Sequence, residues 1–274
     1  MGIFILNKMD KRKSADKFIE LLEIVELLRS PDGCTWDKEQ TNKSLLPYFL
    51  EEAYELIESV ENNDWEGFKE ELGDVLLHII MQAQLSMEQS KFNISDTLDY
   101  INKKLINRHP QVFKNQNYEW IPGTEKNWEV IKQKEKNRNS LLEGVPLKLP
   151  SLSRAQRLQE KAASSGFDWN HIDQVWEKFH EEIQELKLAC QSEKKENIEE
   201  ELGDLLFSIV NLARFLKVPA ESVLRKANKK FVFRFKRIEQ RLKKEGKNFG
   251  DTSSKELNEF WDAIKKEKES NPLH

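Results

Sequence analysis

One pattern of acidic residues occurs twice in this chain with identical internal spacing. Each copy consists of an E-x-x-E pair, fifteen intervening residues and an E-x-x-D pair, and the second copy follows at a constant offset of 130 residues, as from Glu52 to Glu182. The flanking sequences repeat too, because FLEEAYEL and EELGDVLL in the first copy correspond to FHEEIQEL and EELGDLLF in the second. Self-similarity at a fixed period indicates duplication of a structural unit, here of roughly 110–120 residues.

The spacing within each copy predicts a helical hairpin with its acidic residues on one face. Residues three apart on an α-helix lie on the same side, with Cβ atoms roughly 5–6 Å apart. A turn at the midpoint of each pattern, near Asn63 and near Glu193, would make the two helices antiparallel and bring both pairs to one level. Four carboxylates then converge in each repeat: Glu52, Glu55, Glu71 and Asp74 in the first, and Glu182, Glu185, Glu201 and Asp204 in the second.

The rest of the sequence predicts an all-α fold made of two tandem helical bundles. We expect a first repeat over residues 14–137, a linker at 138–150 and a second repeat over 151–270. In the first repeat, helices are expected from Ser14, over 44–61, over 64–89, from Ser95 to Arg108, and through Trp128 and Ile131, with a loop over 111–123. In the second repeat they are expected over 151–165, 171–191, 195–217, 220–245 and 254–269.

Three local details refine this prediction. Residues 75–87 are apolar nearly all round, which is typical of a helix at the centre of a bundle. Gly73 and Gly203 each weaken a helix by about 1 kcal/mol relative to Ala, so we expect another backbone to approach closely there. The segment 231–235 alternates like a strand, but the apolar residues around it recur at helical spacings, so a helix is expected: Leu224, Ala227, Phe231, Phe235, Ile238 and Leu242.

Composition excludes several classes of protein. A net charge of −4 gives no general attraction to nucleic acid or to an anionic membrane, and no apolar run reaches the roughly 18 residues of a membrane span. The two cysteines form neither a disulfide framework nor a metal-ligand spacing. The first residues lack the features of a signal peptide, and Met9 is a second possible start. A reduced, cytoplasmic location is therefore expected.

The paired carboxylates predict a site for a hard divalent cation. A single E-x-x-E pair on a helix is usually a solvated face, but two pairs in matched register, present in two copies, favour a metal site. Oxygen ligands alone suit Mg²⁺ or Mn²⁺. None of the paired carboxylates belongs to a Glu-x-x-His motif, which a di-iron bundle would require. His78, four residues after Asp74, is expected to be a satisfied core histidine, because Ser208 takes its place in the second copy.

Basic residues in the second repeat provide a candidate polyphosphate site. They follow one stripe at helical spacing, comprising Lys226, Lys230, Arg234, Arg237 and Arg241, whereas the first repeat has only Lys104 and Arg108 before Pro110. Beside a metal centre such a stripe would neutralise phosphate charge, although a solvated helix face is the alternative. Trp261 with Lys265 one turn later would add a stacking surface and a cation, unless the ring serves packing alone. Lys178, four residues before Glu182, is a further candidate.

The doubled acidic pattern resembles that of the all-α MazG nucleoside triphosphate pyrophosphohydrolases. The similarity extends over nearly the whole chain, from Gly33-Cys34-Thr35-Trp36-Asp37 through Arg108-His109-Pro110 and Gly166-Phe167-Asp168-Trp169 to Trp261. It implies a homodimeric helical bundle that hydrolyses nucleoside or deoxynucleoside triphosphates to the monophosphate and pyrophosphate. By position it also implies that the second set of carboxylates binds magnesium and that Lys230, Arg234 and Trp261 lie in the substrate-contact region.

Together these features predict a metal-dependent attack of water on the α-phosphorus. Glu181 or Glu200, each one residue before a predicted ligand, is the candidate group to orient or deprotonate that water. The competing hypothesis is a helical scaffold that binds a nucleotide or a regulatory partner without turnover. Base and sugar preference stay open, and the longer basic stripe predicts that the second repeat carries most of the activity.

Overall fold

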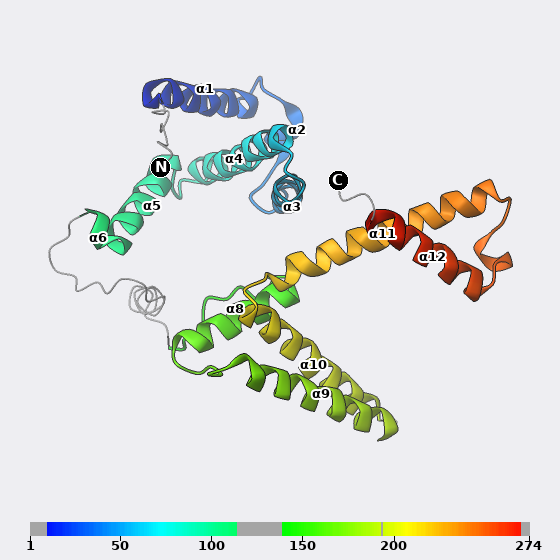
Figure 1. The fold of residues 1–274 in the computed structure, drawn as a ribbon. Helices are drawn as coiled ribbons and strands as arrows, with labels where there is room; N and C mark the ends of the chain where they lie inside the picture. The colour runs from blue at the N-terminus through cyan, green and yellow to red at the C-terminus, as the bar shows by residue number, and fades with distance from the viewer. Residues whose placement is uncertain (1–9, 114–138, 193, 270–274) are drawn as a thin grey trace, which may run out of the picture. The chain divides into compact units, whose positions relative to one another are not determined.

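The structure, a computed structural model, describes residues 10–113, 139–192 and 194–269 (Figure 1). Within these residues every regular element is helical, as the sequence predicts. The chain divides into two compact units, Met1–Trp120 and Ile121–His274. The expected turn centre at Glu193 and the expected helix through Trp128 and Ile131 lie outside the described residues.

The first unit contains a central pair of antiparallel helices flanked by further helices. Its elements in chain order are α1 (Lys11–Arg29), α2 (Thr35–Glu39), α3 (Leu46–Asn62), α4 (Trp65–Glu88), α5 (Ile94–Arg108) and α6 (Pro110–Phe113). Helix α4 packs against both α3 and α1. The expected loop over 111–123 is therefore helical as far as Phe113, and its remaining residues lie outside the described part.

Two helix starts differ from the prediction because a stronger cap lies a few residues upstream. Helix α1 is capped by Asp10, whose carboxylate accepts hydrogen bonds from the backbone N–H groups of Arg12 and Lys13, and not by Ser14. Helix α5 is capped by Asn93 in a capping box with Asp96, and not by Ser95. Asn and Asp rank among the best N-cap residues, and here their side chains reach the free N–H groups of the first turn.

The turn between α3 and α4 forms where the acidic spacing predicts it. Asn63 ends α3 in the left-handed conformation with φ 56°, and its N–H bonds to the carbonyls of Ser59 and Val60. Asp64 then caps α4 by accepting from the Gly67 N–H at 3.0 Å. Asn tolerates the left-handed region better than most residues, so these two residues fix an antiparallel hairpin locally.

The core of the first unit lies between α1 and α4. Val25, Leu45, Ile80, Met81 and Leu85 are buried, and the partly buried Phe18, Leu21 and Leu22 of α1 pack against them. The prediction that 75–87 is buried all round is wrong for one side, because Leu76, Ile79 and Met87 are exposed. One face of α4 is thus covered by described residues and the other is not.

A bidentate ion pair closes this core at its edge. The Arg29 guanidinium donates from Nε to Glu88 Oε1 at 2.7 Å and from Nη2 to Glu88 Oε2 at 2.6 Å, and Nη1 donates to the Asp37 carbonyl. The Arg29 side chain is only 7% exposed. This pair joins α1, α2 and α4, and it lowers the pKa of Glu88 chiefly through the hydrogen bonds from Arg29.

The second unit repeats the central hairpin and adds a longer arm. Its elements are α8 (Ser151–Ser164), α9 (Ile172–Ser192), α10 (Lys195–Phe215), α11 (Ala220–Lys244), the 3₁₀ helix η1 (Phe249–Asp251) and α12 (Ser254–Glu269). Helix α9 runs along α10, α8 packs on α10 and α11, and α12 folds back on α11 (Figure 1). The strand-like segment 231–235 is helical, as predicted.

Two small cores hold this unit together. Val210, Ala213 and Ala220 are buried against α8, and Gln156 of α8 accepts a hydrogen bond from the Ala220 N–H at 2.8 Å. The other core, between α11 and α12, consists of Ile238, Leu242, Phe260 and Ile264. Only the end of the predicted α11 stripe is therefore buried, and Leu224, Phe231 and Phe235 are exposed.

The expectation that another backbone approaches Gly73 and Gly203 closely is wrong for the described chain. A Cβ atom added to Gly73 or Gly203 would meet nothing within 4 Å. Large apolar side chains are exposed beside both glycines, among them Leu72 and Leu76 on α4 and Leu202 and Leu206 on α10. Both central hairpins consequently present an open apolar surface.

Two further expectations concern the chain as a whole. Cys34 and Cys190 are free, exposed thiols, in agreement with the absence of a disulfide framework. In the described residues, no helix has both the length and the hydropathy that crossing a membrane requires.

The Arg29–Glu88 pair predicts a pH-dependent contribution to stability. Glu88→Gln should lower the free energy of unfolding by about 1–3 kcal/mol at pH 7, because a buried guanidinium loses its charged partner. A carboxylate with a lowered folded-state pKa stabilises the protein above its ordinary pKa of about 4.3 and loses this effect as the pH falls through the folded value. The difference between variant and wild type should therefore shrink below about pH 4.

Urea unfolding of the full chain, followed by far-ultraviolet circular dichroism, measures this difference. Glu20→Gln is the matched control, because Glu20 pairs with Lys17 on an exposed surface and should change stability by less than about 0.5 kcal/mol. A destabilisation by Glu88→Gln that persists unchanged at pH 3 would contradict the electrostatic origin of the effect.

Candidate metal centre

The α3–α4 hairpin brings three of its four predicted carboxylates together. Oxygen atoms of Glu52, Glu55 and Glu71 lie within 4.8 Å of one another. Glu52 and Glu55 project from one turn of α3, while Glu71 comes from α4, so the pairing depends on the turn at Asn63. Asp74, one turn further along α4, lies close enough to raise the pKa of Glu52 and Glu71 through its charge.

The α9–α10 hairpin forms a second cluster of the same kind. Here oxygen atoms of Glu182, Glu201 and Asp204 lie within 4.8 Å of one another. Glu185 is not one of this close group, but its charge contributes to the raised pKa of Glu201. Each hairpin therefore gathers three of the four predicted ligands closely and keeps the fourth nearby.

Mutual repulsion and partial burial disfavour the charged form of these groups. Burial, followed by the charges of Glu185, Glu200, Asp204 and Glu182, raises the pKa of Glu201. In the first cluster, burial and then neighbouring carboxylates raise the pKa of both Glu52 and Glu71. A divalent cation bound among them would remove this repulsion.

The residues present fit a hard divalent cation. Glu182 is 5% exposed, and its Oε2 atom is buried without a hydrogen-bond partner. A buried, unpaired carboxylate oxygen costs several kcal/mol unless a cation or donor satisfies it. The cluster contains only oxygen donors, which is the ligand set of Mg²⁺ and Mn²⁺.

A lysine already contacts the second cluster from within α9. The Lys178 ammonium lies 2.8 Å from Glu182 Oε1 and 2.8 Å from Glu181 Oε1. These two carboxylates raise the pKa of Lys178, the hydrogen bond that the ammonium donates to Glu181 being the larger cause. The predicted water-orienting residues Glu181 and Glu200 are both exposed, so neither is hidden from a substrate.

The other predicted substrate residues lie on the α11–α12 arm. Lys226, Lys230 and Lys265 are exposed, and the Arg234 guanidinium stacks over the Trp261 ring at 5.3 Å. None of these five forms an ion pair with the carboxylates of α9 and α10 among the described residues. Trp261 also packs on Phe231 with ring centroids 5.6 Å apart, so its ring serves packing at least in part.

His78 is not the satisfied core histidine that the sequence suggests. Its ring is only partly buried and meets Phe49 edge to face at 6.2 Å, and its Nδ1 atom is buried without a hydrogen-bond partner. Burial lowers the pKa of His78, against the opposing charge of Asp74. A partly buried imidazole one turn from Asp74 therefore distinguishes the first hairpin from the second, where Ser208 is buried and donates a hydrogen bond to the Leu205 carbonyl.

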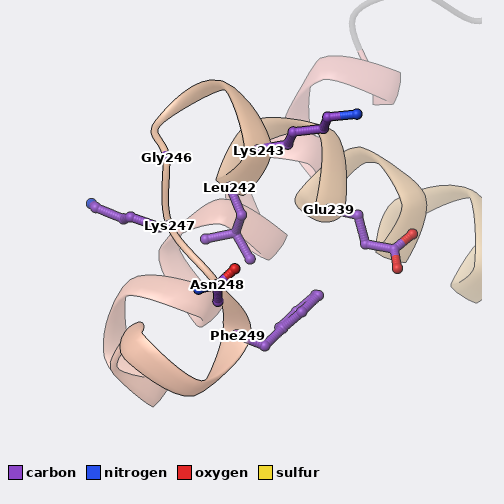
Figure 2. A pocket seen from close by; sticks show the side chains of 7 residues that line it. All are labelled: Glu239, Leu242, Lys243, Gly246, Lys247, Asn248 and Phe249. Atoms are coloured by element: carbon purple, nitrogen blue, oxygen red, sulfur yellow. The ribbon is translucent and has the colours of Figure 1, made fainter.

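A pocket of about 490 Å³ lies where α11 passes into η1 (Figure 2). Its lining residues are Glu239, Leu242, Lys243, Gly246, Lys247, Asn248 and Phe249. None of them was predicted as a site residue from the sequence, although Gly246, with φ 65°, marks the turn at the pocket. Lys247 points away from Leu242 in Figure 2 and is held by Glu245 and Glu256, so its charge is already compensated.

Comparison with known proteins finds the same two hairpins. The profile of the MazG nucleotide pyrophosphohydrolase domain matches residues 40–113 and 172–238. These two segments contain α3 to α6 and α9 to most of α11, and hence all eight predicted metal ligands.

Individual relatives extend the similarity over nearly the full chain. The chain is 47% identical over 251 residues to the nucleoside triphosphate pyrophosphohydrolase/pyrophosphatase MazG of Thermotoga maritima. The aligned region covers 90% of this chain and 95% of that protein. It is 38% identical over 253 residues to the nucleoside triphosphate pyrophosphohydrolase of Escherichia coli K12, covering 90% and 96%. With its two matched segments and these relatives, the chain belongs to the MazG family of nucleotide pyrophosphohydrolases.

Proposed function

We propose that this protein is a Mg²⁺-dependent nucleoside triphosphate pyrophosphohydrolase, which converts nucleoside and deoxynucleoside triphosphates into the monophosphate and pyrophosphate. The observation that carries the proposal is the buried Glu182, which meets Glu201 and Asp204 within 4.8 Å and has an unpaired oxygen. The same residues lie in a segment that matches the MazG domain, and two relatives over most of the chain are named for this activity.

In this proposal the second cluster holds the metal ion. Glu182, Glu201 and Asp204 supply the close oxygen ligands, and Glu185 completes the set from one turn away. The bound ion would supply an acidified water and neutralise negative charge on the phosphates. Glu181 or Glu200 would orient the attacking water, since each adjoins a ligand and faces solvent.

The basic arm would hold the remaining charge of the substrate. Lys226, Lys230 and Arg234 are proposed to neutralise phosphate oxygens, with Lys265 as a further cation and Trp261 as the surface against a base or ribose. Arginine offers a planar pair of donors and lysine a mobile point charge, so both suit phosphate oxygens. The exposure of these lysines supports the proposal, because they are available to a ligand.

We further propose that the protein is a homodimer in which the open apolar faces of the hairpins are covered. Gly73 and Gly203 adjoin exposed leucines on α4 and α10, and nothing in the described chain lies within 4 Å of the position that their Cβ atoms would take. Exposed apolar patches of this kind on helices mark interaction surfaces. Glycine would allow a helix of the second copy to approach closely.

The bond that is cleaved provides the first test. In ¹⁸O-labelled water, the label should appear in the nucleoside monophosphate, because the proposed attack is at the α-phosphorus. Mass spectrometry of the products measures this. Label in the pyrophosphate would refute the mechanism, and full activity after exhaustive chelation would refute the metal dependence. A chain that binds nucleotide without any turnover would support the scaffold hypothesis instead.

The two repeats should differ in activity. Both hairpins gather carboxylates, but the second is followed by α11 of 25 residues with its basic stripe, whereas α5 of the first has 15 residues. Asp204→Asn should lower kcat/KM by about 100-fold or more, and Asp74→Asn by less than about tenfold. The two substitutions are matched, since each removes one charge with little change of shape.

Steady-state kinetics on both variants, with circular dichroism to confirm their folding, measures this difference. Equal losses would mean that both repeats work as active sites. A larger loss from Asp74→Asn would show that the first repeat carries the reaction.

A further inference from the structure

The two acidic clusters differ in one neighbouring side chain, Lys178, which contacts only the second cluster. Lys178 places its ammonium 2.8 Å from an oxygen of Glu182, the most deeply buried carboxylate of the second cluster. The Lys178 side chain is 38% exposed, whereas that of Glu182 is 6% exposed. The lysine therefore reaches the buried carboxylate from the solvent side and is free to leave it.

This contact leaves Glu182 only partly satisfied. Its Oε1 atom accepts the ion pair, while its Oε2 atom is buried without a partner. The Lys178 ammonium divides its hydrogen bonds between Glu182 and the exposed Glu181, at 2.8 Å each. A metal ion bound to Oε2 would lie close to the ammonium group on Oε1 of the same carboxylate, and the two cations would repel each other.

The first cluster has no such competitor. The residue 130 positions before Lys178 is Tyr48, whose ring meets Trp36 edge to face at 5.8 Å. Among the described residues, no lysine or arginine forms an ion pair with Glu52, Glu55, Glu71 or Asp74. The carboxylates of the first cluster lie against one another instead, with oxygen atoms of Glu52, Glu55 and Glu71 within 4.8 Å of one another.

We propose that Lys178 is a resident counter-ion that competes with the divalent metal for Glu182, so that the second cluster binds metal fully only when a substrate phosphate draws the ammonium away. This inference rests on the proposed function, because it requires metal and triphosphate to share the site. It assigns Lys178 two partners in turn, Glu182 before the substrate binds and a phosphate oxygen afterwards. The first cluster, without this lysine, takes up metal independently of nucleotide.

The test measures metal binding to the second cluster alone. In the full-length protein, Glu52→Gln and Glu71→Gln together remove the first cluster and provide the parent background. Free Mn²⁺ is then titrated by electron paramagnetic resonance, without nucleotide. Lys178→Met in this background should tighten the Mn²⁺ dissociation constant about fivefold, as expected for loss of a nearby competing charge.

A second lysine on the same helix provides the control. Lys187 is exposed on α9, two residues after Glu185, and forms no ion pair in the described structure. Lys187→Met removes the same charge, so it should change the Mn²⁺ dissociation constant by less than about twofold. Equal tightening by both variants would overturn the inference, because it would reflect net charge alone. Lys178→Gln with circular dichroism guards against an effect of folding.

Kinetics supply a readout that a purely structural lysine would not move. At saturating metal, Lys178→Met should raise KM for the nucleotide at least about threefold, while metal binding becomes tighter. A higher KM for the nucleotide together with tighter metal binding would show that Lys178 contacts both the phosphate and Glu182. Unchanged Mn²⁺ binding in Lys178→Met would overturn this inference and leave the proposed function intact. Absence of Mn²⁺ binding by every variant, and by the wild type, would contradict the proposed function itself.

Discussion

Repulsion between carboxylates is the constraint on which the rest of the structure depends. Each central hairpin holds three acidic side chains within 4.8 Å of one another, and burial followed by the charges of neighbouring carboxylates raises the pKa of Glu52, Glu71 and Glu201. Folding must supply the free energy to keep them together. The α1–α4 core with its Arg29–Glu88 pair does so in the first unit, and the packing of α8 on α10 does so in the second.

Duplication has produced two similar clusters in different chemical surroundings. The second is approached by Lys178 and followed by the long basic α11, while the first has Tyr48 and the partly buried His78. The two repeats can therefore differ in metal affinity and in phosphate binding. In this account both repeats bind metal, but only the second also binds the phosphates, and its Lys178 couples metal binding to substrate binding.

Helical periodicity made the central hairpins predictable, because the acidic spacing and the Asn63 turn are both local properties of the chain. Competition between neighbouring candidate N-cap residues is harder to judge from the sequence, so the caps Asp10 and Asn93 were missed in favour of nearby serines. Burial was least predictable. Gly73 and the apolar side of α4 imply a close neighbour, but the sequence cannot say whether that neighbour belongs to the same chain or to a second copy.

The central claim is that the acidic clusters are metal sites, and anomalous X-ray scattering from crystals grown with Mn²⁺ tests it most directly. The account predicts anomalous peaks bounded by Glu182, Glu201 and Asp204 in the second repeat and by Glu52, Glu55 and Glu71 in the first. In crystals that also contain a non-hydrolysable nucleoside triphosphate, Lys178 should have left Glu182 in the second site. Absence of a peak at the second cluster in the nucleotide-containing crystals, at Mn²⁺ concentrations that support full activity, would contradict the account.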